Sequence, residues 1–208
     1  GFVRDFDIET VSKTLRLHQK LEGDVSCVVW DTSIVLAKYL EKMCEKRHDR
    51  LENLNVLELG AGVGCVGLTA VCLGANVLLT DLSEVLPSLK LNVHSNKSNW
   101  HNGKGCADVA PLVWGQDLEI EPRPDLIVLA DCVYYKKSVD LLIKTLRGAG
   151  VELRDTDKQK ECWEYFLESV RHDFNLYDVP LNEQDAEYCS ADIVLMKLNK
   201  TIQTYTKL

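Results

Sequence analysis

Three glycines alternate with other small residues in segment 58–64 (Glu-Leu-Gly-Ala-Gly-Val-Gly), directly after a short apolar run. Glycine lets the backbone turn tightly and approach a bound molecule closely. A dinucleotide fingerprint would need glycine where Cys65 stands, and a phosphate-binding loop would need Lys-Ser/Thr after the glycines. Neither pattern is present, so we expect another ligand, with Glu58 facing a cation or a ribose. A glycine-rich turn without a ligand is the alternative.

Two aspartates follow later apolar runs. Asp81 lies 21 residues after Gly60, a position from which a carboxylate can accept both hydroxyls of a ribose. Capping of the next helix is the alternative for this residue. Asp131 is followed by Tyr134 and Tyr135, which would supply a flat wall and hydroxyls beside a carboxylate. A strand cap followed by core aromatics is the alternative there.

Two tryptophans are further candidates for the wall of a ligand site. Trp114 could stack on an adenine ring, and Trp30 precedes a predicted helix. Taken alone, each is better explained as a core residue.

Metal and disulfide chemistry is not expected. The five histidines have no spacing typical of a metal site, and no two of the eight cysteines lie closer than seven residues. We interpret the cysteines as small core residues of a protein in a reducing compartment.

Short apolar runs alternate with segments of helical periodicity along most of the chain. This alternation is typical of a doubly wound α/β fold with a mostly parallel sheet, where ligands bind at the carboxyl ends of the strands. The N-terminal residues predict a β-hairpin. Predicted strands are 55–59, 76–80, 110–113, 125–130, 173–179 and 192–198; predicted helices are 31–46, one ending near residue 73, one that includes 86–93, then 136–147 and 157–172.

Length and composition fit one ordinary globular domain. The chain has 208 residues, of which 46% are hydrophobic and 27% charged. We divide it into a hairpin extension, 1–26, and a core, 27–208, within a single domain 1–208. The net charge of −8 argues against general nucleic-acid binding. No apolar run reaches the roughly 18 residues of a membrane span.

The motifs together resemble the seven-strand S-adenosylmethionine-dependent methyltransferases, and among these the non-histone protein-lysine methyltransferases. The resemblance runs from Phe2 to about Lys200. The glycine motif alone is specific only to the superfamily, whereas its combination with Trp-Asp and Asp-x-x-Tyr is much more specific. These motifs are Trp30-Asp31, Glu58–Gly64, Thr80-Asp81-Leu82, Val113-Trp114-Gly115 and Asp131-Cys132-Val133-Tyr134.

The resemblance implies a Rossmann-like seven-strand fold and a protein-lysine N-methyltransferase that converts S-adenosylmethionine to S-adenosylhomocysteine. It implies a protein substrate, the valosin-containing AAA ATPase, with no nucleic-acid or membrane partner. We expect a monomer in the cytoplasm, with the nucleus as a second location. The residues implied in cofactor binding are Trp30, Glu58, Gly60, Ala61, Gly62, Asp81, Trp114 and Ala130; those implied in catalysis are Asp131 and Tyr134.

One interval departs from this family. The family has an apolar fifth strand between the helix that ends near Arg147 and the segment Glu152-Leu153-Arg154, but only residues 148–151 stand there. We therefore expect the fifth strand to be missing, which would leave a gap beside the strand that ends at Asp131.

Two other functions are open. A methyltransferase for small molecules or nucleic acids could share the fold, although nucleic-acid enzymes often carry Asn/Asp-Pro-Pro-aromatic where this chain has Asp131-Cys132-Val133-Tyr134. A non-catalytic binding scaffold is the second alternative, and a missing strand would favour it.

Overall fold

A seven-stranded sheet forms the centre of the computed structural model, which describes residues 1–20, 25–100, 103–116, 119–149, 152–157 and 160–200. The strand order is β5-β4-β3-β6-β7-β9-β8. Strands β5, β4, β3, β6 and β7 are parallel, whereas β9 runs antiparallel to both β7 and β8. The strands are β3 Asn55–Leu59, β4 Asn76–Asp81, β5 Cys106–Pro111, β6 Leu126–Ala130, β7 Glu152–Asp157, β8 Phe174–Asp178 and β9 Val194–Lys200.

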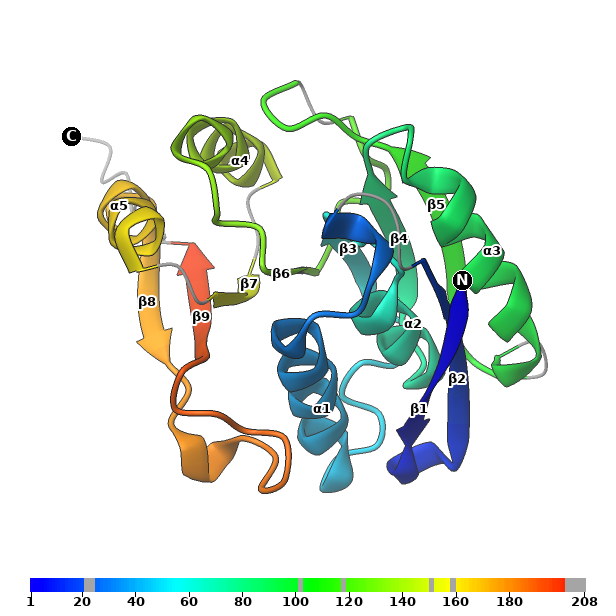
Figure 1. Ribbon diagram of the computed structural model, residues 1–208. Helices are drawn as coiled ribbons and strands as arrows, with labels where there is room; N and C mark the ends of the chain where they lie inside the picture. Colours follow the sequence, from blue (N-terminus) through cyan, green and yellow to red (C-terminus); the bar gives the residue numbers. More distant parts are fainter. Residues whose placement is uncertain (21–24, 101–102, 117–118, 150–151, 158–159, 201–208) are drawn as a thin grey trace.

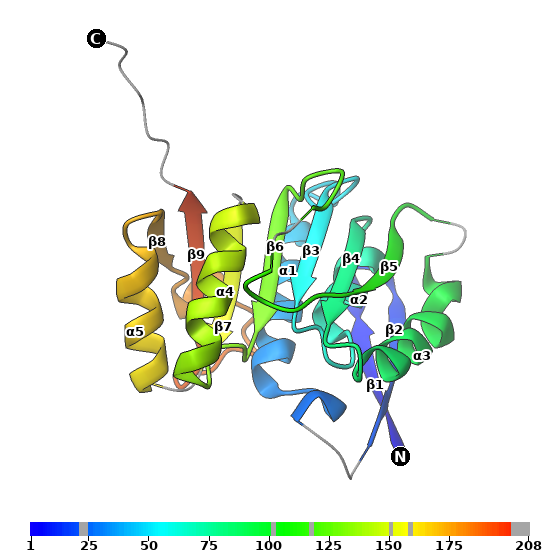
Figure 2. The ribbon, with the colours of Figure 1, turned by 90° about the horizontal axis from the view of Figure 1, so that it is seen from above.

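Helices cover both faces of this sheet (Figures 1 and 2). The apolar residues of α1 and α2 form one buried cluster with the sheet, and those of α4 and α5 form a second cluster on the opposite face. Helix α3 contacts β5 and the N-terminal hairpin. The helices are α1 Asp31–Glu45, α2 Cys65–Cys72, α3 Leu86–Asn96, α4 Lys136–Ala149 and α5 Lys160–Val170, with short 3-10 turns at Glu9–Val11, Val25–Cys27, Lys97–Asn99 and Leu181–Glu183.

Within the described ranges, no helix is both long and apolar enough to span a membrane.

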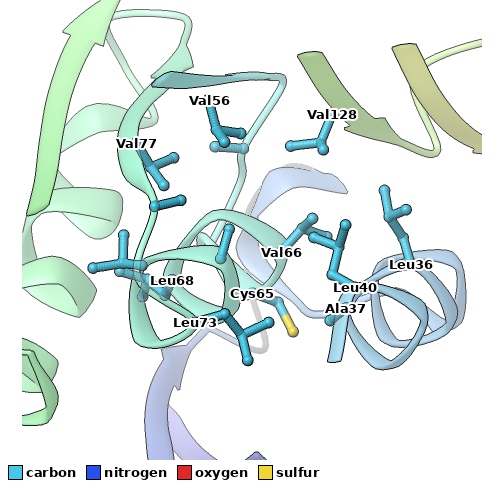
Figure 3. Packing of buried hydrophobic residues seen from close by; sticks show 14 of the residues in the cluster. Leu36, Ala37, Leu40, Val56, Cys65, Val66, Leu68, Leu73, Val77 and Val128 are labelled. Atoms are coloured by element: carbon cyan, nitrogen blue, oxygen red, sulfur yellow. The ribbon is translucent and has the colours of Figure 1, made fainter. Parts of the chain in front are cut away.

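Side chains of the central strands alternate between the two clusters, because successive residues of a strand point to opposite faces of its sheet. Val56 and Val128 pack with α1 and α2, whereas Leu57 and Ile127 pack with α4 and α5. Figure 3 shows the first cluster, where side chains of α1 and α2 meet those of the strands. Burial on both faces explains why these strands are mostly apolar in the sequence.

The predicted hairpin is confirmed as β1 Phe2–Ile8 and β2 Lys13–Gln19, which pair antiparallel. Two asparagines of α3 form hydrogen bonds with the backbone of β2. The Asn92 amide accepts from the His18 N–H at 2.7 Å and donates to the His18 carbonyl at 3.1 Å, and Asn96 makes the same pair of bonds with Arg16. Asn92 also donates to the Val63 carbonyl at 2.9 Å, which connects the hairpin to the glycine loop.

Two predicted boundaries are wrong by several residues. Strand β5 begins at Cys106, earlier than the predicted strand 110–113. Helix α5 begins at Lys160 rather than at Asp157, because Asp157 belongs to β7. Residues 21–24, just before the predicted boundary between the hairpin extension and the core, lie outside the described residues. Gly150 and Val151, before β7, also lie outside them.

The prediction that the fifth strand is missing is wrong. Strand β7 occupies that position and pairs parallel with β6, from Leu126 opposite Glu152 to Ala130 opposite Thr156. On its other side it pairs with β9, so the sheet has no gap beside β6. The physical reason is that strands pair through backbone N–H and C=O groups, which every segment without proline carries. Residues 152–157, predominantly polar, can therefore complete the sheet.

Candidate active site

A cavity of about 450 Å³ opens at the carboxyl ends of β3, β4 and β6. Its size is within the range of small-molecule sites. Residues that begin α1 and α4 and the segment after β5 complete its wall. All but one of the residues that sequence analysis placed in the site line this cavity: Trp30, Gly60, Ala61, Gly62, Asp81, Trp114, Ala130, Asp131 and Tyr134.

The glycine loop between β3 and α2 lies against its neighbours with no room for side chains at two positions. A Cβ atom on Gly60 would be 2.9 Å from the Cys132 Sγ, and one on Gly62 would be 3.2 Å from the Ser26 carbonyl oxygen. Both glycines also have positive φ, +64° and +54°, which L side chains rarely adopt. The loop therefore presents bare backbone to the cavity.

Asp81 holds this loop to the end of β4. Its carboxylate accepts hydrogen bonds from the N–H groups of Gly62 and Leu82, both at 2.7 Å. Helix α3 begins only at Leu86, with Val85 as its N-cap and no side-chain cap. Asp81 is thus a residue of the cavity wall, and the alternative of a helix cap is wrong.

Glu58 is the exception among the predicted site residues, because the structure places it behind the loop and away from the cavity wall. Its side chain is 4% exposed, and its carboxyl accepts a hydrogen bond from the Gly67 N–H at 3.0 Å. Burial raises the pKa of this carboxyl to about 8; the Gly67 bond opposes the shift, and the charge of Asp81 adds to it. Glu58 is therefore protonated at neutral pH and supports the start of α2.

The end of β6 brings a carboxylate and two aromatic rings to the cavity. Asp131 has φ +58°, a left-handed conformation that costs most residues energy and that aspartate tolerates better than most. The rings of Tyr134 and Tyr135 meet edge to face, with centroids 4.8 Å apart. The two tyrosines line the cavity with Asp131, so the alternative of core aromatics after a strand cap is wrong.

The two tryptophans also belong to the cavity wall. Trp30 is 43% exposed at the N-cap of α1, and Trp114 is half-buried, near Gly60. The prediction of a core residue is therefore wrong for Trp30, whereas Trp114 both lines the cavity and packs against the second buried cluster. Sequence analysis missed several wall residues, of which Leu82 and Val113 directly adjoin predicted ones. The missed residues are Ser26, Val28, Ser33, Val63, Cys65, Leu82, Leu112, Val113, Cys132, Ser138 and Leu141.

All eight cysteines are free. Burial raises the pKa of the Cys65 thiol to about 12, so this wall residue stays protonated. In the part of the chain that the structure describes, no three His, Cys, Asp or Glu side chains are grouped to hold a metal ion.

The strand order and the cavity at the strand ends define the class of fold: the Rossmann-like α/β fold of methyltransferases. One solved structure with this fold is the Thermus thermophilus 16S rRNA N2 G1207 methyltransferase RsmC, with TM-score 0.68 and 17% identity over 96% of this chain and 50% of that chain. Another is the glycopeptide N-methyltransferase MtfA in complex with S-adenosyl-L-methionine, with TM-score 0.60 and 12% identity over 79% of this chain and 94% of that chain.

Sequence relatives narrow the class. Residues 9–158 match the model of a family described as lysine methyltransferase. Protein N-lysine methyltransferase METTL21A of Danio rerio is 37% identical over 77% of this chain and 73% of its own length. EEF1A lysine methyltransferase 3 of Xenopus tropicalis is 39% identical over 62% of this chain and 55% of its own length. The chain belongs to this lysine methyltransferase family. S-adenosylmethionine, which is bound in the MtfA structure of the same fold, is the cofactor consistent with this family.

The described residues fit this cofactor. The bare backbone at Gly60 and Gly62 leaves room for close approach, and Asp81 offers carboxylate oxygens at the next strand end. The half-buried ring of Trp114 provides a flat surface in the same cavity.

Proposed function

We propose that the chain transfers a methyl group from S-adenosylmethionine to the side-chain amine of a lysine in a non-histone protein, at the cavity described above. The observation that carries the proposal is that one cavity joins the glycine loop to Asp131 and Tyr134. A missing strand was the reason to consider a non-catalytic scaffold, and the seven-stranded sheet removes that reason.

The cofactor would lie along the strand ends. Gly60, Ala61 and Gly62 would line its amino-acid end, and the Asp81 carboxylate would accept from the ribose hydroxyls. Trp114 would lie beside the adenine, and Trp30 and Ala130 would complete the contacts; these three residues line the same cavity. Glu58 would act indirectly, since it supports the first turn of α2 from behind the loop.

The chain must then present a neutral amine to the methyl donor. S-adenosylmethionine supplies a methyl group on a positively charged sulfur, and only an unprotonated amine has the lone pair to accept it. Because the ordinary pKa of lysine is about 10.4, the site must desolvate the amine and orient it toward the methyl group. Asp131 can accept a hydrogen bond from that amine, and Tyr134 can form the wall of its channel. Carboxylate and aromatic groups also favour the positive charge of the reacting centre.

The proposed substrate is the valosin-containing AAA ATPase, because the sequence resembles the lysine methyltransferase that acts on it. This resemblance includes the N-terminal Phe2-Val3-Arg4 and segment 27–31, in addition to the shared motifs. A lysine on an accessible loop of that ATPase would be the target. Another chaperone-type protein is the alternative substrate.

Labelled methyl transfer into a cell extract tests the proposal. Purified chain and S-adenosylmethionine labelled on the methyl group are added to extract, and labelled proteins are digested and identified by mass spectrometry. We expect label on lysine, with the AAA ATPase among the products. Gly62→Arg is the control, because a side chain there would press on the Ser26 carbonyl, distort the loop and abolish labelling. Label on nucleic acid or on a metabolite instead of lysine would contradict the proposal.

A further inference from the structure

Exposed apolar side chains gather around the mouth of the cavity. Ten large hydrophobic side chains are exposed in the described part of the chain, and five of them line this one cavity. Exposed apolar groups that cluster, rather than scatter, mark a binding surface. The five are Trp30 (43% exposed), Leu82 (43%), Val113 (45%), Tyr135 (67%) and Leu141 (48%).

Four of the five side chains fall into two groups along the cavity, and the fifth, Leu141, belongs to α4. Leu82 follows Asp81 and Val113 precedes Trp114, so these two lie at the proposed adenosine end. Trp30 precedes α1, whereas Tyr135 follows the Asp131–Tyr134 segment and precedes α4. Because α1 and α4 pack on opposite faces of the sheet, Trp30 and Tyr135 approach the mouth from opposite sides.

Both aromatic residues are held in place by the helices that they precede. The Trp30 carbonyl accepts a hydrogen bond from the Ile34 N–H at 3.2 Å, and the Tyr135 carbonyl accepts from the N–H groups of Ser138 and Val139 at 2.8 and 3.1 Å. The Tyr135 ring also meets the Tyr134 ring edge to face. These positions are therefore fixed by backbone bonds, while much of each ring remains exposed.

An aromatic residue is a poor choice for such a position in terms of stability alone. Ser, Thr, Asp or Asn before the first helical residue can bind the orphan N–H groups of the helix, and these residues are strongly preferred there. Trp30 makes no side-chain cap bond. An exposed aromatic at both helix starts, beside one cavity, thus points to binding rather than to folding.

We propose that Tyr135 and the exposed part of the Trp30 side chain form an aromatic gate that contacts apolar side chains next to the target lysine in the protein substrate. The inference rests on the proposed function, because a lysine that reaches Asp131 must bring its neighbouring residues across this mouth. Lys136 follows Tyr135, but its ammonium lies over the Tyr165 ring, 4.6 Å from the centroid, so its charge is already engaged by another aromatic ring. The gate recognises its substrate through apolar contact, and lysines with apolar neighbours are methylated in preference to lysines with charged ones.

Tyr135→Ser tests the gate, because serine can cap α4 and the variant should fold at least as well as wild type. Label transfer is measured in dilute extract, where the initial rate follows kcat/KM, and in concentrated extract. We expect a roughly tenfold lower rate in dilute extract, as for loss of an aromatic binding residue, with most of it recovered in concentrated extract. Affinity for S-adenosylmethionine, from calorimetry, and the urea midpoint should not fall. Residues beside the lysines that wild type labels should be enriched in apolar types.

Tyr177→Ser is the matched control, since Tyr177 is a tyrosine with 52% exposure on β8 and does not line the cavity. It should label as fast as wild type. A Tyr135→Ser variant that labels dilute extract at the wild-type rate would overturn the gate and leave the proposed function standing. A wild-type chain that labels no protein lysine would instead contradict the proposed function itself.

Discussion

Glu41 of α1 and Glu58 of β3 are both 4% exposed, yet their surroundings differ. The Glu41 carboxylate accepts from the Lys38 ammonium at 2.9 Å and from the Thr10 N–H at 2.8 Å. The Glu58 carboxyl accepts from one backbone N–H, that of Gly67, and lies near the like charge of Asp81. The Glu41 carboxylate thus pairs with a cation and joins α1 to the hairpin, whereas the protonated Glu58 carboxyl supports the glycine loop of the candidate site.

The Lys38 ammonium shows how strongly the first region is paired. It also donates to the Asp7 carbonyl at 2.7 Å and to the Glu9 carboxylate at 3.1 Å. Burial lowers the pKa of Lys38, but the hydrogen bonds and charges of Glu41 and Glu9 outweigh burial and raise it above its ordinary value. The two buried acids thus differ in the charge beside them: Glu41 meets the Lys38 ammonium, whereas Glu58 lies near the Asp81 carboxylate.

Breaking the pair at α1 should have the largest effect on stability. Lys38→Met leaves the Glu41 carboxylate buried without its cation, and removing one partner of a buried pair costs about 3–5 kcal/mol. We expect a loss of that size in the free energy of unfolding, measured with urea at pH 7. Lys46→Met, at an exposed position at the end of the same helix, should change it by less than about 0.5 kcal/mol. Equal midpoints for the two variants would show that the pair does not stabilise the fold.

Removing the carboxylate of Asp81 should act on the ligand. Hydrogen bonds to charged groups contribute about 1.5–3 kcal/mol, so Asp81→Ala should weaken S-adenosylmethionine roughly tenfold to a hundredfold in calorimetry. Asp108→Ala is the control, because Asp108 is exposed on β5 away from the cavity. If the affinity of folded Asp81→Ala equals that of wild type, Asp81 only anchors Gly62 and Leu82.

Glu58→Gln should change the pH dependence of stability. The folded carboxyl has a pKa of about 8 against an ordinary value of 4.5, so between these pH values the folded chain keeps a proton that the unfolded chain has released. Wild-type stability therefore falls as pH rises through this window, by at most about 1.4 kcal/mol per pH unit from this group. Gln does not titrate, so the variant gains stability relative to wild type from pH 5 to pH 8. Parallel urea curves for the two proteins across this range would contradict a protonated Glu58.

Sequence patterns predict the strands that hold the site, because β3, β4 and β6 are largely buried on both faces and therefore mostly apolar. Sequence patterns fail for β7, because its polar residues pair with β6 through backbone groups and the pattern of side chains does not reveal this pairing. The glycines, Asp81 and Asp131 are predictable because they follow strands whose carboxyl ends share one edge. The sequence did contain an indication that Glu58 is buried behind the loop. Glu58 lies two residues after Val56 in β3, so both side chains point to the face that α1 and α2 cover. The exposure of Tyr135 depends on how α4 packs, which no local pattern encodes.

Single-turnover methyl transfer by Asp131→Asn tests the proposed chemistry most directly. Asparagine keeps the shape of the side chain at the cavity but removes a negative charge beside the amine and the positively charged methyl donor. Because that charge matters more to the reacting centre than to the adenosine end, the variant should fold and bind S-adenosylmethionine as wild type does. It should transfer the methyl group to protein lysine roughly a hundredfold more slowly. Transfer at the wild-type rate, with cofactor bound, would contradict Asp131 as the catalytic carboxylate.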